Sequence, residues 1–291
     1  MAKFLLLGLG SAGRRHMELL ASLRPAAHIL TADPYAPLRP SDPALVHYSD
    51  WRTLLDHHGD ADAAIIASPT EYHLVQLLAC LERGIPTLVE KPLLTGAQYA
   101  NGEWLALSSP EGAQTHYDLA SVKCAVNCQY RYDPGIEWLI DHVSADIPKH
   151  LTFTGQDELL FRYGPHVDEV MCAHPIDTAL WLLGAAAAGQ PPSLPGVNLE
   201  SDGIMIRGSI EHERGESHYN FRMDTGPRES WAMSAGYKTV LGHADNYRRA
   251  LLAWLQWIEG GERDECTATL ADGLAVSAVL AQVQHVEAIS V

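Results

Sequence analysis

The sequence predicts an α/β Rossmann domain with a parallel, doubly wound sheet, followed by an α+β domain with a mostly antiparallel sheet. Three observations lead to this prediction. Short apolar runs alternate with amphipathic helical patterns over the first part of the chain, which is typical of a parallel sheet covered on both faces. A glycine-rich stretch follows the first apolar run. After about residue 130 the pattern changes to alternating apolar and polar residues, so we expect domains at 1–128 and 129–291.

The first domain is expected to alternate strands and helices. Strands are predicted at 3–7, 28–32, 63–67, 86–89 and 122–128, and helices at 11–23, 51–57, 71–83 and 97–107. The proline-rich stretch 35–49 is expected to be a loop, and Gly84 closes the third helix.

The second domain is expected to combine helices with a small sheet. Helices are predicted at 136–143, 174–183, 247–258 and 271–286, and a strand at 151–154. Gly184 ends the helix at 174–183, and a loop follows at 185–198. Segments 203–211, 216–223 and 230–240 alternate and predict an antiparallel meander.

Charge and composition exclude several classes of partner. The 291 residues carry a formal net charge of -16, which argues against nucleic acid or an anionic membrane as partner. No apolar stretch approaches the ~18 residues of a membrane span. The N-terminal run MAKFLLLGLG is short and broken by glycines, so we expect a buried strand and no signal peptide.

The cysteines and histidines predict neither disulfides nor a metal site. The five cysteines are odd in number and scattered, which is typical of free thiols in the reducing cytoplasm. The 15 histidines form no helical pair with a third ligand, so we expect no bound metal.

The stretch GLGSAGRRH, which starts at residue 8, carries the spacing G-x-G-x-x-G. Gly8 permits a tight turn out of a strand, and Gly10 lets the backbone approach a pyrophosphate. Gly13 lets the following helix pack closely on the sheet. Free backbone amides at the start of that helix, at Ser11 and Ala12, attract phosphate charge. The context of strand before and helix after therefore predicts a dinucleotide site.

Asp33 follows the second predicted strand, 20 residues after Gly13. A carboxylate there can accept hydrogen bonds from ribose hydroxyls, which favours NAD over NADP. Asp-Pro is also a common turn, so a capping role is the alternative, and both remain open at this point.

Two further motifs end neighbouring strands. ASPTEYH follows the third apolar run, and VEKPL ends the fourth, so both lie at the carboxyl edge where open α/β sheets bind ligands. In a cleft, the Lys91 ammonium can lose solvation and its pKa can fall, which suits proton exchange with an alcohol. A surface turn is the alternative interpretation of Glu-Lys-Pro.

In this order and spacing, the three motifs resemble the sugar dehydrogenase and reductase family that includes glucose–fructose oxidoreductase and inositol dehydrogenase. Three later segments, QYRYDPGI from residue 129, CAHPIDTALWLLG from residue 172 and DNYRRALLAWL from residue 245, extend the resemblance over nearly the whole chain. The resemblance implies hydride transfer between NAD, with NADP possible, and a hydroxyl or keto carbon of a sugar, cyclitol or sugar nucleotide. It also implies a homo-oligomer formed through the C-terminal sheet.

By position, Lys91 matches the family's active-site lysine and His174 its histidine, and both would handle the proton. Asp177, one turn after His174, would orient that histidine, bind a substrate hydroxyl, or have a structural role. The residues that would hold the cofactor are Gly8, Gly10, Ser11, Ala12, Gly13, Asp33, Ser68, Pro69, His73, Glu90 and Lys91.

One position departs from the family pattern. Many members place an Asp four residues before the histidine, where this chain has Val170. Asp168 and Glu169 are nearby at another spacing, so either one of them substitutes, or proton transfer relies on Lys91 and His174, or the chemistry has changed. The alternative function is therefore a non-catalytic, NAD(P)-binding sensor or regulatory protein of the same fold.

Overall fold

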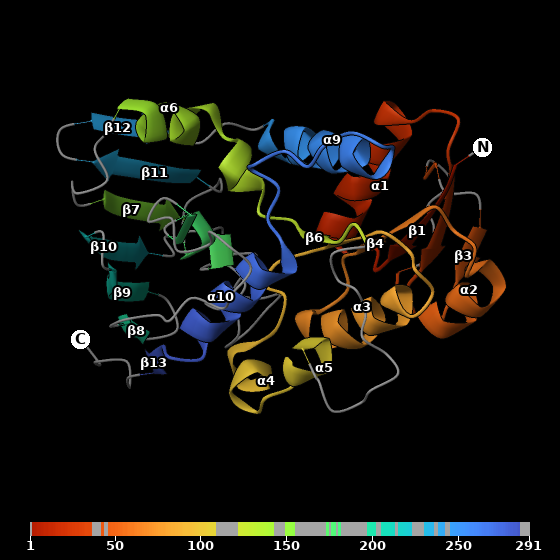
Figure 1. Ribbon diagram of the computed structural model, residues 1–291, viewed down its shortest axis with the longest axis horizontal. Coiled ribbons are helices and arrows are strands. Elements are labelled where there is room, and N and C mark those ends of the chain that lie inside the picture. The colour runs from red at the N-terminus through yellow and green to blue at the C-terminus, as the bar shows by residue number, and fades with distance from the viewer. Residues whose placement is uncertain are drawn as a thin grey trace. The chain divides into compact units, whose positions relative to one another are not determined.

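The computed structural model of the chain describes most of the first half and parts of the second (Figure 1). The described residues are 2–36, 42–43, 46–108, 122–142, 149–154, 173–174, 176–178, 180–181, 197–201, 205–212, 215–222, 230–235, 238–241 and 245–285.

The first sheet is parallel throughout and has the strand order β3-β2-β1-β4-β5-β6. Its strands are β1 (Lys3–Leu7), β2 (His28–Ala32), β3 (Val46–Tyr48), β4 (Ala63–Ile66), β5 (Thr87–Val89) and β6 (Ala125–Val126). This is the order of a dinucleotide-binding Rossmann fold, in which the strand order reverses between β1 and β4. The predicted parallel Rossmann sheet is therefore confirmed.

Helices cover both faces of this sheet (Figure 1). Helix α1 (Ser11–Leu23) and helix α9 (Asn246–Ile258) lie on one face, while α2 (Trp51–His58) and α3 (His73–Leu81) lie on the other. Alternate side chains of the strands point to opposite faces, so Phe4 and Leu6 share a core cluster with Met17 of α1 and Trp254 of α9. The continuous apolar runs of the sequence arise from this two-sided burial.

Several elements of this part differ from the predictions. The stretch expected to be a loop contains the short edge strand β3, and the strand expected at 122–128 is reduced to β6. The helix expected at 71–83 starts with a 3₁₀ turn, η1 (Thr70–Tyr72). The helix expected at 97–107 is wrong, because a turn with Gly102 at φ +76° divides it into α4 (Gly96–Ala100) and α5 (Leu105–Ser108).

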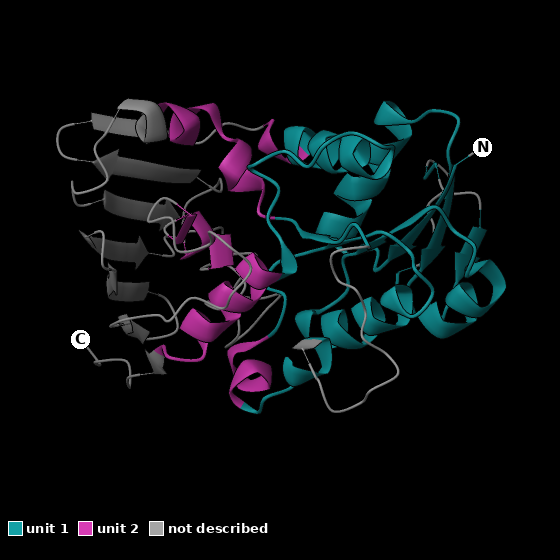
Figure 2. Ribbon diagram, viewed as in Figure 1, with its two compact units in different colours: residues 1–94, 101–127, 248–270 teal, residues 95–100, 128–247, 271–291 magenta. Residues whose placement is uncertain are grey.

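The chain forms two compact units (Figure 2). One comprises residues 1–94, 101–127 and 248–270, and the other comprises 95–100, 128–247 and 271–291. Most of α9 therefore belongs to the first unit, although it follows most of the second unit in sequence. Division into two domains at residue 128 stays a prediction.

The second unit contains a sheet with the order β12-β11-β7-β10-β9-β8-β13. Its strands are β7 (Lys149–Thr154), β8 (Val197–Ser201), β9 (Met205–His212), β10 (Gly215–Arg222), β11 (Ser230–Ala235), β12 (Lys238–Leu241) and β13 (Gln284–His285). Pairs β8–β9, β9–β10, β7–β11 and β11–β12 are antiparallel. Pairs β7–β10 and β8–β13 are parallel.

This sheet corrects the predicted meander. Strand β7 lies between β10 and β11, so the three expected strands are not consecutive neighbours. The third expected strand is an antiparallel pair, β11 and β12. Strands β8 and β13 fall where a loop and a helix end were expected, because pairing across the sheet decides short segments that carry no clear periodicity.

The remaining elements of the second half are mostly helical. They are η2 (Gln129–Tyr132), α6 (Pro134–His142), which packs against β12, and α10 (Leu270–Leu280). Residues 173–174, 176–178 and 180–181 are helical, whereas Gly184 and Val170 lie outside the described residues. In the described part of the chain, no helix is long and apolar enough to cross a membrane.

The described cysteines are free thiols. Cys80, Cys124 and Cys128 are buried, and Cys266 is partly exposed. Burial raises the pKa of Cys80 and of Cys124 to about 12, so neither is a reactive thiolate at neutral pH.

Candidate functional site

The glycine loop after β1 is shaped by two close approaches. Gly8 has φ +95°, and a Cβ on it would lie 2.5 Å from the carbonyl oxygen of Ala67. A Cβ on Gly13 would lie 2.0 Å from the Gly8 carbonyl oxygen. Gly10 differs, because a Cβ there would meet nothing within 4 Å. Two glycines therefore form the turn, and the third is the exposed point at the start of α1.

Asp33 ties the glycine loop to the end of β2. Its Oδ2 accepts a 2.7 Å hydrogen bond from the Leu9 amide, and its Oδ1 accepts 2.8 Å bonds from the amides of Tyr35 and Ala36. The carboxylate thus caps the turn after β2, and it also lies beside the glycine loop. The contact with ribose stays a prediction.

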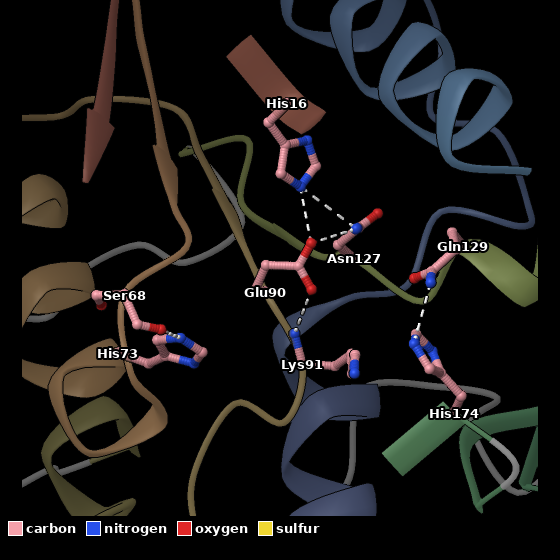
Figure 3. Close-up of polar contacts among 8 residues, drawn as sticks. All are labelled: His16, Ser68, His73, Glu90, Lys91, Asn127, Gln129 and His174. Atoms are coloured by element: carbon pink, nitrogen blue, oxygen red, sulfur yellow. Dashed lines mark hydrogen bonds and ion pairs between the residues drawn. The ribbon is translucent and has the colours of Figure 1, made fainter. Parts of the chain in front are cut away.

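His73 connects the loops that follow β4 and β5. Its Nε2 lies 2.8 Å from the Ser68 carbonyl oxygen (Figure 3). Its Nδ1 lies 2.8 Å from the Pro92 carbonyl oxygen. Burial lowers the pKa of His73 below its usual range, although both carbonyls favour the protonated ring. Ser68 is half-buried and donates from Oγ to Gln76, and Pro69 is exposed. His73 is therefore a buried link between two motif loops.

Glu90 lies at the centre of a buried polar network (Figure 3). Its Oε1 accepts 2.7 Å hydrogen bonds from His16 Nε2 and Asn127 Nδ2, and the Lys91 amide donates to Oε2 at 3.3 Å. Burial by itself raises the pKa of the Glu90 carboxyl, but the contact with His16 and the nearby Lys91 charge hold it below its usual range. The network links α1 to the ends of β5 and β6.

Lys91 lies two residues after the end of β5, at the carboxyl edge of the first sheet, where β1, β2, β4 and β6 also end. It is half-buried, and a cis peptide bond joins it to Pro92. The structure therefore places Lys91 and the glycine loop at the same edge of one parallel sheet, which is where ligands bind in this fold.

His174 lies in the second unit and is buried. The Gln129 amide nitrogen lies 3.0 Å from its Nε2, and the Tyr130 ring stacks on it with centroids 4.3 Å apart. Thr178 Oγ1 donates to the His174 carbonyl one turn later in the helical segment. Gln129, Tyr130 and the helix together define the orientation of the imidazole.

Asp177 pairs with Arg131, and both side chains are buried. Arg131 donates from Nε to Oδ2 at 3.0 Å and from its terminal guanidinium nitrogen to Oδ1 at 2.6 Å. Asp272 lies 3.4 Å from the same guanidinium. Burial raises the pKa of Asp177 despite the Arg131 charge. The ion pair with Arg131 is what a structural role of Asp177 requires. A role of Asp177 in orienting His174 or in binding substrate stays a prediction.

Three residues of these networks were missed by sequence reasoning as site candidates. His16 lies one helical turn after the glycine spacing, and Asn127 and Gln129 follow the buried strand β6. A signal existed for the last two, since polar residues directly after a buried parallel strand face the ligand edge. No set of His, Cys, Asp and Glu side chains among the described residues is arranged to hold a metal ion.

A comparison with families of known proteins found a match for the first part of the chain. A family model described as "Oxidoreductase family, NAD-binding Rossmann fold" matches residues 2–121. The match covers fewer than half of the 291 residues and shows that residues 2–121 are similar to this family. The glycine loop fits its cofactor, because the space above Gly10 is open where a pyrophosphate would approach. NAD is thus the cofactor class of this domain.

Two relatives match short segments of the chain. Inositol 2-dehydrogenase of Rhodococcus erythropolis (strain PR4 / NBRC 100887) is 33% identical over 96 residues, which cover 31% of this chain and 28% of that protein. Inositol 2-dehydrogenase of Rhodococcus jostii (strain RHA1) is 56% identical over 36 residues, which cover 12% of this chain and 10% of that protein. The matched segments therefore span less than a third of the length of each of these relatives.

Solved structures resemble the chain over almost its whole length. The WlbA (WbpB) dehydrogenase of Thermus thermophilus, solved with NAD and UDP-GlcNAcA, has a TM-score of 0.74 at 18% identity and covers 99% of this chain and 97% of its own. The myo-inositol dehydrogenase of Lactobacillus casei, solved with NAD(H) and myo-inositol, has a TM-score of 0.71 at 15% identity and covers 97% and 93%. At these identities the likeness shows a shared fold.

Proposed function

We propose that this protein is an NAD(P)-dependent oxidoreductase that transfers a hydride between nicotinamide and a hydroxyl or keto carbon. The observation that carries the proposal is the shared edge of the first sheet, where the open glycine loop and Lys91 both follow parallel strands. A cofactor loop and a proton-exchanging amine at one edge are what alcohol oxidation requires.

When bound, the cofactor accepts or donates the hydride, and the chain's residues hold it in place. The loop from Gly8 to Gly13 would bind the pyrophosphate through backbone amides, and Asp33 would accept bonds from the ribose, which favours NAD over NADP. His73 and Glu90 are buried and hydrogen-bonded to neighbouring loops, so we propose that they act by positioning Ser68 and Lys91.

The proton would be exchanged by Lys91 and His174. An imidazole takes up the hydroxyl proton near neutral pH, and an ammonium hydrogen-bonds the same oxygen as charge develops on it. Asp177 would contribute by fixing Arg131 and the helical segment that carries His174.

We propose a sugar, cyclitol or sugar nucleotide as substrate. The solved structures with myo-inositol and with UDP-GlcNAcA support this class, since both ligands are polyhydroxylated rings. The mostly antiparallel second sheet would carry the substrate face and the contact of a homo-oligomer. A cytoplasmic location suits the free cysteines of the described residues.

The variants Lys91→Ala and His174→Ala test the proposal. Each is expected to lower turnover by about 10²–10⁴-fold, the usual contribution of a general acid or base, while the dissociation constant of NAD stays within about threefold. Lys3→Ala and His28→Ala remove the same side chains at exposed or partly exposed positions and should leave both quantities unchanged. The measurements are absorbance of reduced nicotinamide with a panel of polyols and sugars, and calorimetric titration with NAD.

The alternative function is a cofactor-binding sensor or regulatory protein, which Val170 allows, whereas the presence of both Lys91 and His174 favours the enzyme. In that case no compound of the panel would change the redox state of nicotinamide, while NAD would bind and alter association with another protein. Turnover that survives in both active-site variants would also contradict the proposal.

A further inference from the structure

Gln129 and His174 form a buried amide–imidazole pair. Their side chains are 1% and 3% exposed, and the Gln129 nitrogen lies 3.0 Å from His174 Nε2 (Figure 3). An amide nitrogen only donates hydrogen bonds, so in this arrangement Nε2 is the acceptor and the proton of the neutral ring is on Nδ1. In that tautomer the lone pair of Nε2 is used by the amide and Nδ1 carries the proton, so the ring has no basic nitrogen left for a substrate proton.

The opposite end of the same amide is buried and unsatisfied. Gln129 Oε1 has no hydrogen-bond partner in the described part of the chain. A half-turn of the amide about its last bond exchanges the oxygen and nitrogen, which have nearly the same size. Oε1 then accepts from His174 Nε2–H, and the basic nitrogen of the ring is Nδ1, a buried atom that exchanges a proton only with a group packed directly against it.

We propose that Gln129 is the positioning residue that decides which nitrogen of His174 exchanges protons. This rests on the proposed role of His174. With the amide oxygen toward the ring, Nε2 keeps its proton, and Nδ1 takes the hydroxyl proton as the hydride leaves for nicotinamide. The resulting imidazolium keeps its Nε2–H···Oε1 bond, which is stronger because the donor is charged.

The surroundings of the pair hold the ring in place. Tyr130 stacks on the imidazole at an interplanar angle of 21°. The charged groups of the adjoining segments are Arg131 in η2, Asp177 in the His174 helix and Asp272 in α10, and they pair with one another. Gln129 is therefore the side chain whose hydrogen bond to the imidazole can be changed without altering those pairs.

Two substitutions separate this role from a structural one. Gln129→Glu supplies only acceptors and a negative charge, so the titration midpoint of His174 should rise by about one to three pH units. The midpoint of the acid side of the pH profile of kcat/KM should move to higher pH by the same amount. Gln129→Met keeps the length and removes the hydrogen bond, so kcat should fall at least about tenfold, with the KM for NAD within about twofold.

The readout that does not need turnover is NMR of the histidine ring nitrogens, with the His174 signals identified by their loss in His174→Gln. Gln256→Glu makes the same substitution at an exposed position of α9 and should move neither the titration nor the pH profile. In the unsubstituted protein, Nε2 should remain protonated while Nδ1 titrates, which tests the proposal even where a Gln129 variant does not fold.

The outcomes are distinguishable. Protonation of Nδ1 throughout the titration of the unsubstituted protein, or a His174 midpoint unchanged in folded Gln129→Glu, overturns the role of Gln129. A midpoint that moves as expected while the profile of kcat/KM stays fixed keeps the pair and removes His174 from the proposed chemistry. Absence of any turnover rejects the proposed function and leaves the NMR result to decide on Gln129.

Discussion

At the scale of single residues, Glu90 shows why a motif residue can matter without reaching a ligand. Its carboxylate is 5% exposed and is shared by His16 and Asn127, while the next residue along the chain is Lys91. A buried charge is tolerated only when such partners satisfy it. The resemblance identified Glu90 as a site residue, but the residues that hold it come from 74 and 37 positions away.

Substitution of Glu90 by Gln should lower the free energy of unfolding by about 1–3 kcal/mol at pH 7, because a charge-assisted buried hydrogen bond is lost. The folded-state pKa of Glu90 is lowered, so its stabilising contribution is present above the unfolded value of 4.5 and is lost as pH falls below it. Urea unfolding should therefore show a steeper loss below about pH 4.5 in the unsubstituted protein than in Glu90→Gln.

Glu259→Gln is the matched control for this prediction. It removes a carboxylate from the exposed pair with Arg24, so it should cost less than about 1 kcal/mol. Equal losses in the two variants, or parallel pH curves, would show that burial of Glu90 adds nothing.

Asp177 marks the limit of sequence reasoning at this scale. Its helical spacing from His174 fits a role in catalysis and a structural role equally well. The contact with Arg131 spans 46 positions, and the pairing of two distant buried side chains leaves no periodic signal in either segment. By contrast, Gly8 and Gly13 could be assigned in advance, because local backbone geometry alone requires them.

At the scale of elements, the glycine loop before α1 contains one glycine that packing requires, Gly13, and one that packing does not require, Gly10. Gly13→Ala places a methyl group 2.0 Å from the Gly8 carbonyl and should reduce the free energy of unfolding by several kcal/mol, or prevent folding. Gly10→Ala meets no neighbour within 4 Å and should change that free energy by no more than about 1 kcal/mol.

Gly10→Ala, which should hardly change the stability of the fold, should instead weaken the binding of NAD. Folded Gly10→Ala is expected to bind NAD at least about tenfold more weakly, because its methyl group occupies the approach of the pyrophosphate. Circular dichroism melts and calorimetric titration measure the two quantities. Unchanged NAD affinity in Gly10→Ala would remove this loop from the proposed site.

The bounds of elements with a clear apolar periodicity or a continuous apolar run were predicted correctly, whereas the bounds of elements without such a pattern were not. Helix α1 and strand β2 have the predicted bounds, since an apolar face or a buried run decides them locally. The division between α4 and α5 depends on one glycine in a positive-φ turn. Strand β13 pairs with β8, which lies far earlier in the chain, so its local sequence carries no signal for it.

At the scale of the whole molecule, the cofactor should be visible as a stabilising ligand. NAD at 100 times its dissociation constant should raise the free energy of unfolding by about 2.7 kcal/mol, because it binds only the folded chain. NADP at the same concentration should raise it less, since Asp33 would repel the additional phosphate. Differential scanning fluorimetry with both nucleotides measures the difference. Gly10→Ala is the control: a tenfold weaker affinity should make its stabilisation by NAD smaller by about 1.3 kcal/mol at the same concentration.

A larger shift with NADP would contradict the preference inferred from Asp33. No shift with either nucleotide would contradict the proposed function as a whole. The formal charge of -16 makes the comparison sensitive to salt, so both nucleotides should be measured at one ionic strength.

Helix α9 comes late in the sequence but packs in the first unit, and this affects how the chain folds during synthesis. Met17 on α1 and Leu6 on β1 share their core cluster with Trp254, which the ribosome adds more than two hundred residues later. The face of the first sheet that α1 and α9 share is therefore covered only in part until nearly all of the polypeptide has been synthesised. A premature stop before α9 would release a glycine loop without the core that supports it, and chaperones would meet that exposed face first.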